Sequence, residues 1–315
     1  MKKEKQYIIA IDGGGTKTDA VLVDENGKYL NQIKTEPSNP HKIGTQKAIA
    51  RLSQTIKILM RNYSFPELGF IYIALAGGLE RDKNKAKIIR KGLLKEIPEL
   101  SFLKNKIEIQ GDQLAGFRSG TNEKTGIVVI AGTGSIVMGW KKGQEVVVGG
   151  WDYILGDQGS GFWLGQKAFQ AVCRDLDKRG PETQLTNMIL KKLGVKKESN
   201  LMEKIYQKDI VKTIASLSSL IDKAVTKKDK IAKEISILAG QELALAVKTA
   251  IRELNLSKIK FPIVIIGGVF NSKIIFNTFK KQVKKIAPQA SIVRPKSTPI
   301  TGAVNIALEL FRHLE

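Results

Sequence analysis

The sequence has 315 residues, enough for two globular domains with buried cores. Its 42% hydrophobic and 26% charged residues exclude a disordered or collagen-like chain. The 52 Lys and Arg against 30 Asp and Glu give a net charge of +22, which attracts polyanions. The lysines, however, are scattered over predicted helices and turns without interleaved aromatic residues. We therefore expect no nucleic-acid partner.

The first part of the chain predicts three strands followed by alternating helices and strands. Short apolar runs bounded by turn residues indicate the strands, and apolar residues at helical spacing indicate the helices. The expected elements, in chain order, are strands at 7–11, 19–23 and 28–34, a helix at 43–59, a strand at 70–75, a helix at 83–97, a strand at 106–109 and a short helix at 114–117.

The same plan begins again near residue 126. The segments IIAIDGGGTKTDAVLVDENGK and IVVIAGTGSIVMGWKKGQ share strand, small-residue turn, strand and charged hairpin in one order, which predicts two related folds facing each other. The expected elements are strands at 126–131, 136–140 and 145–148, a mostly helical stretch at 158–254, a strand at 262–266, a helix at 272–286, a strand at 291–293 and a helix at 300–314. We therefore predict an N-terminal domain at 1–113, joined by the C-terminal helix at 299–315, and a C-terminal domain at 114–298 with a helical insertion at 158–254.

The first segment with chemical character follows the first strand. It consists of one aspartate, three glycines, two threonines and a lysine: Asp12, Gly13, Gly14, Gly15, Thr16, Lys17 and Thr18. Such a turn can present backbone amides to phosphate, and Asp12 can hold a hydrated Mg²⁺ ion. The alternative is a plain hairpin in which the glycines only supply positive φ angles. The composition exceeds what a hairpin needs and favours phosphate binding.

Two further glycine turns follow strand ends. Thr133 and Ser135 lie in a Gly-Thr-Gly-Ser turn at the matching place in the second half, where it could bind a phosphate group from the other side. Gly267 and Gly268 follow the strand at 262–266 and precede a helix that has Ser272 near its start. This third turn would let a base or ribose approach the backbone, or it could be a helix-capping loop.

Carboxylates and an aromatic residue mark two other segments. Asp112 follows a strand end, where it could accept a proton from an attacking hydroxyl or could cap the next helix. Gly150, Trp151 and Asp157 lie in one loop, and an aromatic face with carboxylates suits a sugar ring. The alternative for this loop is an Asx-type turn that leads into a helix.

The composition limits other kinds of site. The single cysteine, Cys173, cannot form an intramolecular disulfide or a thiolate metal site, and two histidines offer little material for a serine–histidine triad. No apolar run reaches the roughly 18–20 residues of a membrane helix. The apolar stretch behind the N-terminal lysines ends at Asp12, too soon for an export signal. We expect a cytoplasmic protein with no membrane segment.

Taken together, these segments resemble the actin, hexokinase and Hsp70 ATPase superfamily, and within it the N-acetylglucosamine kinase and BadF/BadG/BcrA/BcrD group. The resemblance covers nearly the whole chain through DGGGTKTDAVL, SNP at 38–40, GDQLAG at 111–116, AGTGSI, GGWDYILGDQGSGFWLG, IIGGVFNS and TPITGAV. It implies an α/β fold of two ribonuclease H-like (actin-like ATPase) domains with an ATP and sugar cleft between them.

The resemblance also implies a function and residue roles. The function is that of an ATP- and Mg²⁺-dependent kinase of an amino sugar, with N-acetylglucosamine expected as the acceptor and N-acetylglucosamine 6-phosphate as the product, in a homodimeric protein. Asp112 is the implied catalytic base. The implied sugar ligands are Asn39, Ser135, Ile136, Gly150, Trp151 and Asp157. The implied nucleotide ligands are Gly13, Thr133, Ala239 and Gly268.

Two departures from the family pattern leave the preferred amino sugar open. Ile136 and Ala76 stand where the kinases have asparagine and serine, so hydrogen bonds to the sugar would be lost there. The alternative function is that of an ATPase that regulates a partner protein. Related activators hold an iron–sulfur cluster with two cysteines from each of two subunits, which one cysteine per chain cannot supply, so this alternative has no cluster.

Overall fold

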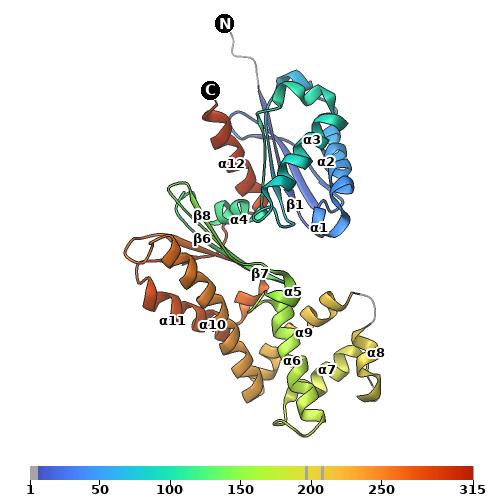
Figure 1. Ribbon diagram of the computed structural model, residues 1–315, viewed down its shortest axis with the longest axis vertical. Helices are drawn as coiled ribbons and strands as arrows, with labels where there is room; N and C mark the ends of the chain where they lie inside the picture. Colours follow the sequence, from blue (N-terminus) through green and yellow to red (C-terminus); the bar gives the residue numbers. More distant parts are fainter. Residues whose placement is uncertain (1–5, 196–197, 207–208, 315) are drawn as a thin grey trace. The chain divides into compact units, whose positions relative to one another are not determined.

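The structure is a computed structural model that describes residues 6–195, 198–206 and 209–314. Its contacts divide the chain into two compact units. Unit 1 consists of Met1–Asn122 together with Pro295–Glu315, and unit 2 is Glu123–Arg294. Each unit is built on one five-stranded sheet (Figure 1).

Unit 1 contains a mixed sheet with helices on both faces. Its elements are β1 (Tyr7–Gly13), β2 (Thr18–Asp24), β3 (Tyr29–Thr35), α1 (Pro40–Ile43), α2 (Thr45–Leu59), η1 (Phe65–Glu67), β4 (Leu68–Leu75), α3 (Lys83–Glu96), η2 (Pro98–Leu103), β5 (Ile107–Gln110), α4 (Asp112–Gly120) and α12 (Pro299–Arg312). The strand order is β3-β2-β1-β4-β5, in which β1 to β3 are antiparallel and β4 and β5 run parallel to β1.

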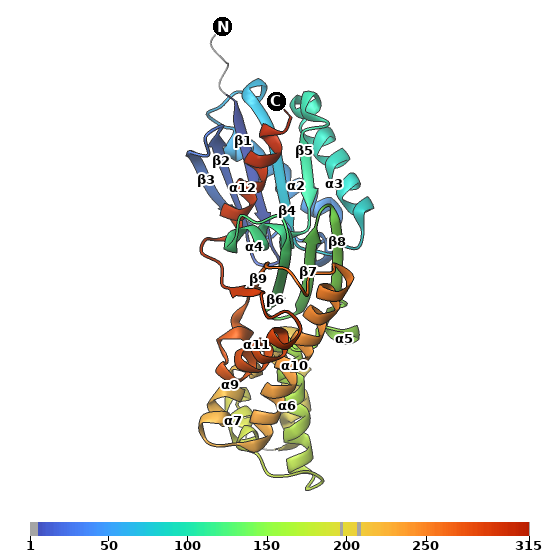
Figure 2. The ribbon, with the colours of Figure 1, turned by 90° about the vertical axis from the view of Figure 1, so that its left-hand side faces the viewer.

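Alternating side chains of the central strand separate two cores in unit 1. Ile9 and Ile11 pack in the core that α2 and α3 cover, whereas Ile8 and Ala10 pack in the core that α12 and α4 cover. Figures 1 and 2 show α12 on the opposite side of this sheet from α2 and α3. Period-two alternation therefore produces a sheet that is buried on both faces. The C-terminal helix α12 is thus part of unit 1.

The division between the units differs from the predicted domain boundary at residue 113. Helix α4 packs closely against α12, and Arg118 Nη2 donates to Glu309 Oε2 at 2.8 Å. The backbone amides of Lys296 and Ser297 also donate to the Ser119 carbonyl. Because α4 packs on α12 and its C-terminal turn is tied into unit 1, the division lies after α4 at one point of the chain and before Pro295 at the other.

Unit 2 repeats the sheet and adds a group of helices. Its elements are β6 (Gly126–Ala131), β7 (Ser135–Lys141), β8 (Gln144–Gly149), α5 (Asp152–Leu155), α6 (Gly161–Leu176), α7 (Gln184–Leu193), η3 (Glu198–Asn200), α8 (Leu201–Ile205), α9 (Ile210–Thr226), α10 (Lys230–Glu253), β9 (Pro262–Ile266), η4 (Gly268–Asn271), α11 (Lys273–Ile286) and β10 (Ser291–Val293). The strand order is β10-β9-β6-β7-β8. When the strands of each unit are numbered along the chain and this sheet is read from β8, the order is third, second, first, fourth and fifth. Unit 1 has the same order, so the predicted duplication is confirmed.

The helices of unit 2 pack through small residues. Helix α6 lies against α9, where Gly165 faces the Ile214 carbonyl so closely that a Cβ would overlap it. Helix α10 contacts both the sheet and α11, and Gly240 faces the Ile275 carbonyl there. Figure 1 shows α7, α8 and α9 gathered around one end of α6. These close contacts fix the position of α9, which becomes important for the cavity described below.

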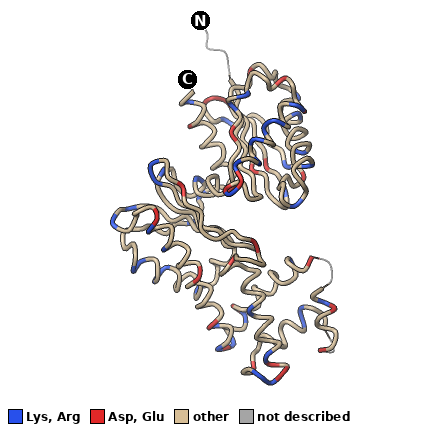
Figure 3. The backbone as a smooth tube through the Cα atoms, in the orientation of Figure 1, with Lys and Arg blue, Asp and Glu red and all other residues tan. Residues whose placement is uncertain are grey.

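The surface charges are dispersed. Figure 3 shows Lys and Arg along helices and turns of both units, with Asp and Glu among them. Within the described part of the chain, no helix combines the length and apolar character that crossing a membrane requires.

Candidate functional site

The first glycine turn joins β1 to β2 in unit 1, and its glycines provide space rather than an unusual backbone conformation. None of Gly13, Gly14 and Gly15 has a positive φ angle. A Cβ on Gly13 would overlap Ser38 Oγ, and one on Gly15 would lie 3.0 Å from Lys42 Nζ. The plain hairpin alternative, which required positive φ, therefore does not describe this turn, and the missing side chains allow close approach instead.

The predicted phosphate ligands of this turn differ in accessibility. Thr16 and Lys17 are exposed, whereas Thr18 is fully buried. The Thr18 hydroxyl donates to the Glu36 carbonyl at 2.8 Å and contacts Ser38 Oγ at 2.8 Å. Thr18 is thus engaged in fixing the turn, so the phosphate contact predicted for its side chain is better assigned to Thr16 and Lys17.

Carboxylates accumulate at this end of the unit 1 sheet. Asp12 ends β1 opposite Asp19 of β2, and burial together with the Asp19 charge raises the pKa of Asp12 to about 6. Lys17 forms an ion pair with Asp19, which raises the pKa of Lys17. Burial, Asp12 and Glu80 raise the pKa of Asp112 to about 7. Burial in a poorly hydrated place, together with repulsion between neighbouring carboxylates, explains the raised pKa values of the two aspartates.

Asp112 does not serve as a helix cap. Helix α4 begins at Asp112 itself, with Gly111 in the N-cap position and no side-chain capping hydrogen bond. The neighbouring Gln113 donates to Glu80 Oε2 at 3.3 Å, and its buried Oε1 atom lacks a partner. Of the two roles considered for Asp112, the capping role is therefore wrong, and its carboxylate is left for proton transfer or ligand binding.

The residues at this edge fit a magnesium ion. Mg²⁺ prefers carboxylate, water and phosphate oxygens, and a divalent cation would relieve the repulsion that raises the pKa values of Asp12 and Asp112. The described residues contain no cluster of three or more His, Cys, Asp or Glu that could hold a metal alone. Asp12 would therefore hold the ion together with water and phosphate.

Asn39, the predicted sugar ligand of unit 1, lies beside a glycine loop. Its Oδ1 atom accepts from the amide of His41 at 2.9 Å and caps α1. A Cβ on Gly77 would lie 2.7 Å from that oxygen, and Lys85 Nζ donates to the Gly77 carbonyl at 3.2 Å. The oxygen of the Asn39 amide is occupied, so its NH₂ group is the part that could reach a ligand.

The second glycine turn, between β6 and β7 of unit 2, is held by helix α6. The amides of Gly161 and Phe162 donate to the carbonyls of Gly132 and Thr133 at 2.7 and 3.0 Å. The next amide of α6, that of Trp163, is capped by Ser160 Oγ. Because the first amides of α6 are used in this way, a phosphate at this turn must be bound by the turn's own amides and the Thr133 hydroxyl.

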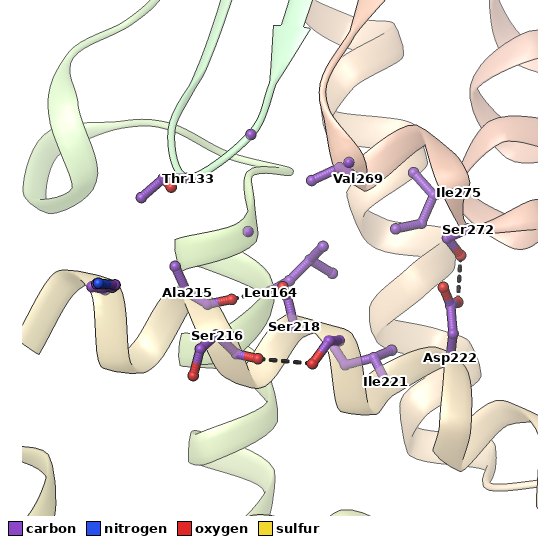
Figure 4. A pocket seen from close by; sticks show the side chains of 15 residues that line it. Thr133, Leu164, Ala215, Ser216, Ser218, Ile221, Asp222, Val269, Ser272 and Ile275 are labelled. Carbon is purple, nitrogen blue, oxygen red and sulfur yellow. Dashed lines mark hydrogen bonds between the residues drawn. The ribbon is translucent and has the colours of Figure 1, made fainter. Parts of the chain in front are cut away.

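A cavity of about 420 Å³ in unit 2 begins at this turn. It runs between α9 and the start of α11, and Thr133, Gly268 and Ser272 are the predicted nucleotide ligands that line it (Figure 4). Its other lining residues are Gly132, Gly161, Leu164, Lys212, Ala215, Ser216, Ser218, Ser219, Ile221, Asp222, Val269 and Ile275. Glycines at one end and apolar side chains along the walls suit a phosphorylated nucleoside.

Gly267 and Ala239, two other predicted nucleotide ligands, do not line this cavity. Gly267 has φ +108° and packs against the carbonyl of Ala131, which brings the β9 loop against the second glycine turn. Ala239 is fully buried within the core of unit 2. Its small side chain packs within that core, and the ligand contact expected of Ala239 stays a prediction.

The predicted sugar ligands of unit 2 come together beside the second turn. The amide of Ser135 donates to the Asp157 carboxylate, and the amide of Gly150 donates to the Ser135 carbonyl at 3.0 Å. Gly150 packs directly on Ile136. Ser135, Ile136 and the half-exposed Trp151 line a groove of about 280 Å³ that the C-terminal half of α10 completes.

Two aspartates of this loop have a strained backbone, and one of them has a carboxyl group with a raised pKa. Asp152 and Asp157 both have positive φ angles, +69° and +56°. Burial raises the pKa of Asp157 to about 6, against the lowering effect of its hydrogen bond from the Ser135 amide. Strained residues persist where the surroundings hold them, and such places are often functional.

Residues on α9 are the part of the cavity that sequence reasoning missed. Lys212, Ser216, Ser219 and Asp222 line it from one helix, and Ser272 Oγ donates to Asp222 Oδ1 at 2.6 Å (Figure 4). The only signal in the sequence is the polar stripe on one face of a helix that is otherwise apolar. Such a stripe normally marks a solvated face, so it gives no warning of a cavity.

A sequence profile of the BadF/BadG/BcrA/BcrD ATPase family matches residues 9–307, nearly the whole chain. The chain belongs to this family. This BadF/BadG-type chain is 33% identical to an N-acetylmuramic acid/N-acetylglucosamine kinase of Clostridium acetobutylicum, over 96% of this chain and 98% of the relative. It is 32% identical to an N-acetyl-D-glucosamine kinase of Dictyostelium discoideum, again over 96% and 98%.

Solved structures agree on the fold of this BadF/BadG-type chain. A candidate N-acetylglucosamine kinase of Chromobacterium violaceum matches with a TM-score of 0.71 and 22% identity, over 96% of this chain and 99% of the other. The predicted two-domain, actin-like α/β fold is confirmed.

Proposed function

We propose that the chain is an ATP-dependent kinase that transfers the γ-phosphoryl group to the 6-hydroxyl of an amino sugar, with N-acetylglucosamine as the first acceptor to test. The observation that carries this proposal is the Asp112 carboxylate: it caps no helix, and its pKa is raised to about 7. A carboxylate with a pKa near the working pH is suited to accept a proton and to be regenerated.

Asp112 accepts the proton as the sugar oxygen attacks the γ-phosphorus, and the bond to the ADP oxygen breaks. Phosphoryl transfer of this kind depends on positioning and on compensation of negative charge. Bound Mg²⁺, held by Asp12, would neutralise charge on the phosphate oxygens. Thr16, Lys17 and the Gly132–Thr133 turn are the groups of this chain that would bind phosphate, and Ser135, Trp151, Asp157 and Asn39 would orient the sugar.

The acceptor is proposed from the names of the relatives. N-acetylglucosamine occurs in the names of both the Clostridium and the Dictyostelium kinase, and N-acetylmuramic acid occurs in the first. The Ile136 side chain lies against Gly150 and offers no hydrogen bond to an acetamido group, so this side chain does not select for one. N-acetylmuramic acid and glucosamine are therefore the next acceptors to compare.

The deciding experiment measures ADP formation with Mg²⁺ and each of N-acetylglucosamine, N-acetylmuramic acid, glucosamine, N-acetylmannosamine and glucose, beside a reaction without sugar. We expect turnover that depends on one or two amino sugars and that Asp112→Asn lowers by about 10²- to 10⁴-fold. Equal turnover with and without every sugar would refute the kinase proposal and favour an ATPase that regulates a partner protein. The homodimer and the cytoplasmic location stay predictions, and sedimentation analysis of the purified chain would test the first.

A further inference from the structure

The cavity in unit 2 has two chemically different ends. Gly132 and Thr133 form one end, and Ser272 with Asp222 forms the other (Figure 4). Lys212 and Asp222 both face the cavity from α9, ten residues apart, which at about 1.5 Å per residue spans roughly 15 Å of the helix. A carboxylate repels phosphate, so a nucleotide in this cavity would place its phosphates at the glycine turn and its nucleoside toward Asp222.

The Asp222 carboxylate is accessible and has room for more hydrogen bonds. An ionised carboxylate can accept about four hydrogen bonds, and Ser272 Oγ supplies one to Oδ1 at 2.6 Å. The described residues provide no other donor to Asp222, which is exposed at the rim of the cavity, whereas Ser272 is only 5% exposed. The buried hydroxyl therefore holds one carboxylate oxygen in place and leaves the other free.

The nucleoside group that best matches this arrangement is a pair of adjacent hydroxyls. A ribose presents two O–H donors on neighbouring carbons, which can reach a carboxylate oxygen and the oxygen of Ser272. The edge of adenine presents an N–H₂ donor beside a ring nitrogen that a carboxylate repels. Between the two ends, the apolar side chains of Leu164, Ile221, Val269 and Ile275 suit the faces of a base, and the serines of α9 add hydroxyl groups to the wall but no charge.

We propose that Asp222 and Ser272 bind the 2′- and 3′-hydroxyls of the nucleotide's ribose, so that Asp222 is a specificity residue for ribonucleotides. This inference rests on the proposed function because it assumes that the cavity takes the phosphoryl donor. It adds α9, which lies in the helical insertion, to the elements that recognise the nucleotide.

The test is a binding measurement that does not depend on phosphoryl transfer. Isothermal titration calorimetry would compare ADP, 2′-deoxyADP, 3′-deoxyADP and GDP with the unmodified protein and with Asp222→Ala, Asp222→Asn and Lys223→Met. We expect ADP to bind at least tenfold more tightly than either deoxynucleotide, and Asp222→Ala to bind all three equally. Asp222→Asn keeps the acceptor for Ser272 and should retain part of the discrimination. Lys223→Met, an exposed neighbour outside the cavity, should behave as the unmodified protein.

Several outcomes would overturn the inference. Equal binding of ADP and the deoxynucleotides, or discrimination that survives Asp222→Ala, would show that the ribose is not read here. A preference for GDP that Asp222→Ala removes would assign the carboxylate to the paired donors of guanine instead. A failure of the proposed function is distinguishable, because tight, ribose-dependent ADP binding without phosphoryl transfer to any sugar would refute the kinase and leave Asp222 in its role. Thermal unfolding of each variant establishes that it is folded.

Discussion

Gly267 offers the sharpest test of how the cavity is built, because its backbone and its surroundings both exclude a side chain. It has φ +108° and ψ 157°, a conformation that is essentially restricted to glycine and costs other residues about 1–3 kcal/mol. A Cβ would overlap the Ala131 carbonyl and lie 2.9 Å from the Gly132 nitrogen, and such overpacking against backbone costs about 1–3 kcal/mol more. We expect Gly267→Ala to lower the free energy of unfolding by about 3 kcal/mol or more.

The neighbouring glycine provides the matched control. Gly268 has no positive φ, and a Cβ there would meet nothing within 4 Å, yet the residue lines the cavity. Gly268→Ala should therefore unfold like the unmodified protein but raise the KM for ATP, because the methyl group occupies ligand space.

Thermal and urea unfolding, monitored by circular dichroism without ligand, would measure the difference. A loss of about 3 kcal/mol corresponds to a decrease in Tm of roughly 6–12 °C in a domain of roughly 150–250 residues. Gly267→Ala with a Tm within 1 °C of the unmodified protein would refute the reasoning, as would Gly268→Ala that is as unstable as Gly267→Ala.

Three further predictions concern the carboxyl groups. Asp112→Asn should lower kcat by about 10²- to 10⁴-fold while calorimetry still detects ADP binding; turnover at the unmodified rate would contradict the role of Asp112 as base. Since the pKa of Asp112 is raised to about 7, the fraction able to accept a proton falls as the pH falls, and kcat/KM should decline below about pH 7; a profile that is flat down to pH 5 would contradict this. Asp157→Ala should raise the KM for the sugar about tenfold with little change for ATP, and in the unmodified protein that KM should rise below about pH 6, where Asp157 becomes protonated; equal sugar KM values in both proteins would exclude Asp157 as a ligand.

The fold was accessible to sequence reasoning because its signals are local. The alternation in β1 between Ile9 and Ile11 on one face and Ile8 and Ala10 on the other marks a strand buried on both sides. The repeated strand and glycine-turn pattern revealed the duplication. The place where unit 1 ends could not be found in this way, because it depends on the packing of α4 against α12, which lies almost 180 residues further along the chain.

The candidate site was only partly accessible for the same reason. Residues in glycine turns, such as Thr133 and Gly268, stand out because turn chemistry is local, and the structure brings both to one cavity. Asp222 lies in a long helix whose pattern shows only an amphipathic face, and its place in the cavity follows from the contact of α6 with α9 at Gly165. For Ala239, which was carried over from the resemblance, the ligand contact stays a prediction, because the structure shows only that the residue is buried in the core.

The duplicated sheets also explain why the proposed chemistry is divided unequally. The last register pair of the first hairpin is Gly13 with Thr18 in unit 1 and Ala131 with Ser135 in unit 2, so the residues just before them correspond: Asp12 to Ile130. One half therefore has a carboxylate at the end of its first strand where the other half has an apolar residue.

This difference has an electrostatic consequence at each sheet edge. In unit 1, the carboxylates of Asp12, Asp19 and Asp112 repel a bare phosphate. This edge can therefore hold a polyphosphate only when a metal ion is bound and Asp112 serves as proton acceptor. In unit 2 the uncharged Ile130 stands at this place, and Gly267 lies against the Ala131 carbonyl, which places the Gly268 loop at the cavity and lets the nucleoside lie against backbone. An aspartate in one half and an isoleucine in the other thus distinguish the half suited to phosphoryl transfer from the half suited to nucleoside binding. Ile130→Asp should consequently weaken ADP binding without Mg²⁺, and calorimetry that finds unchanged binding would refute this division.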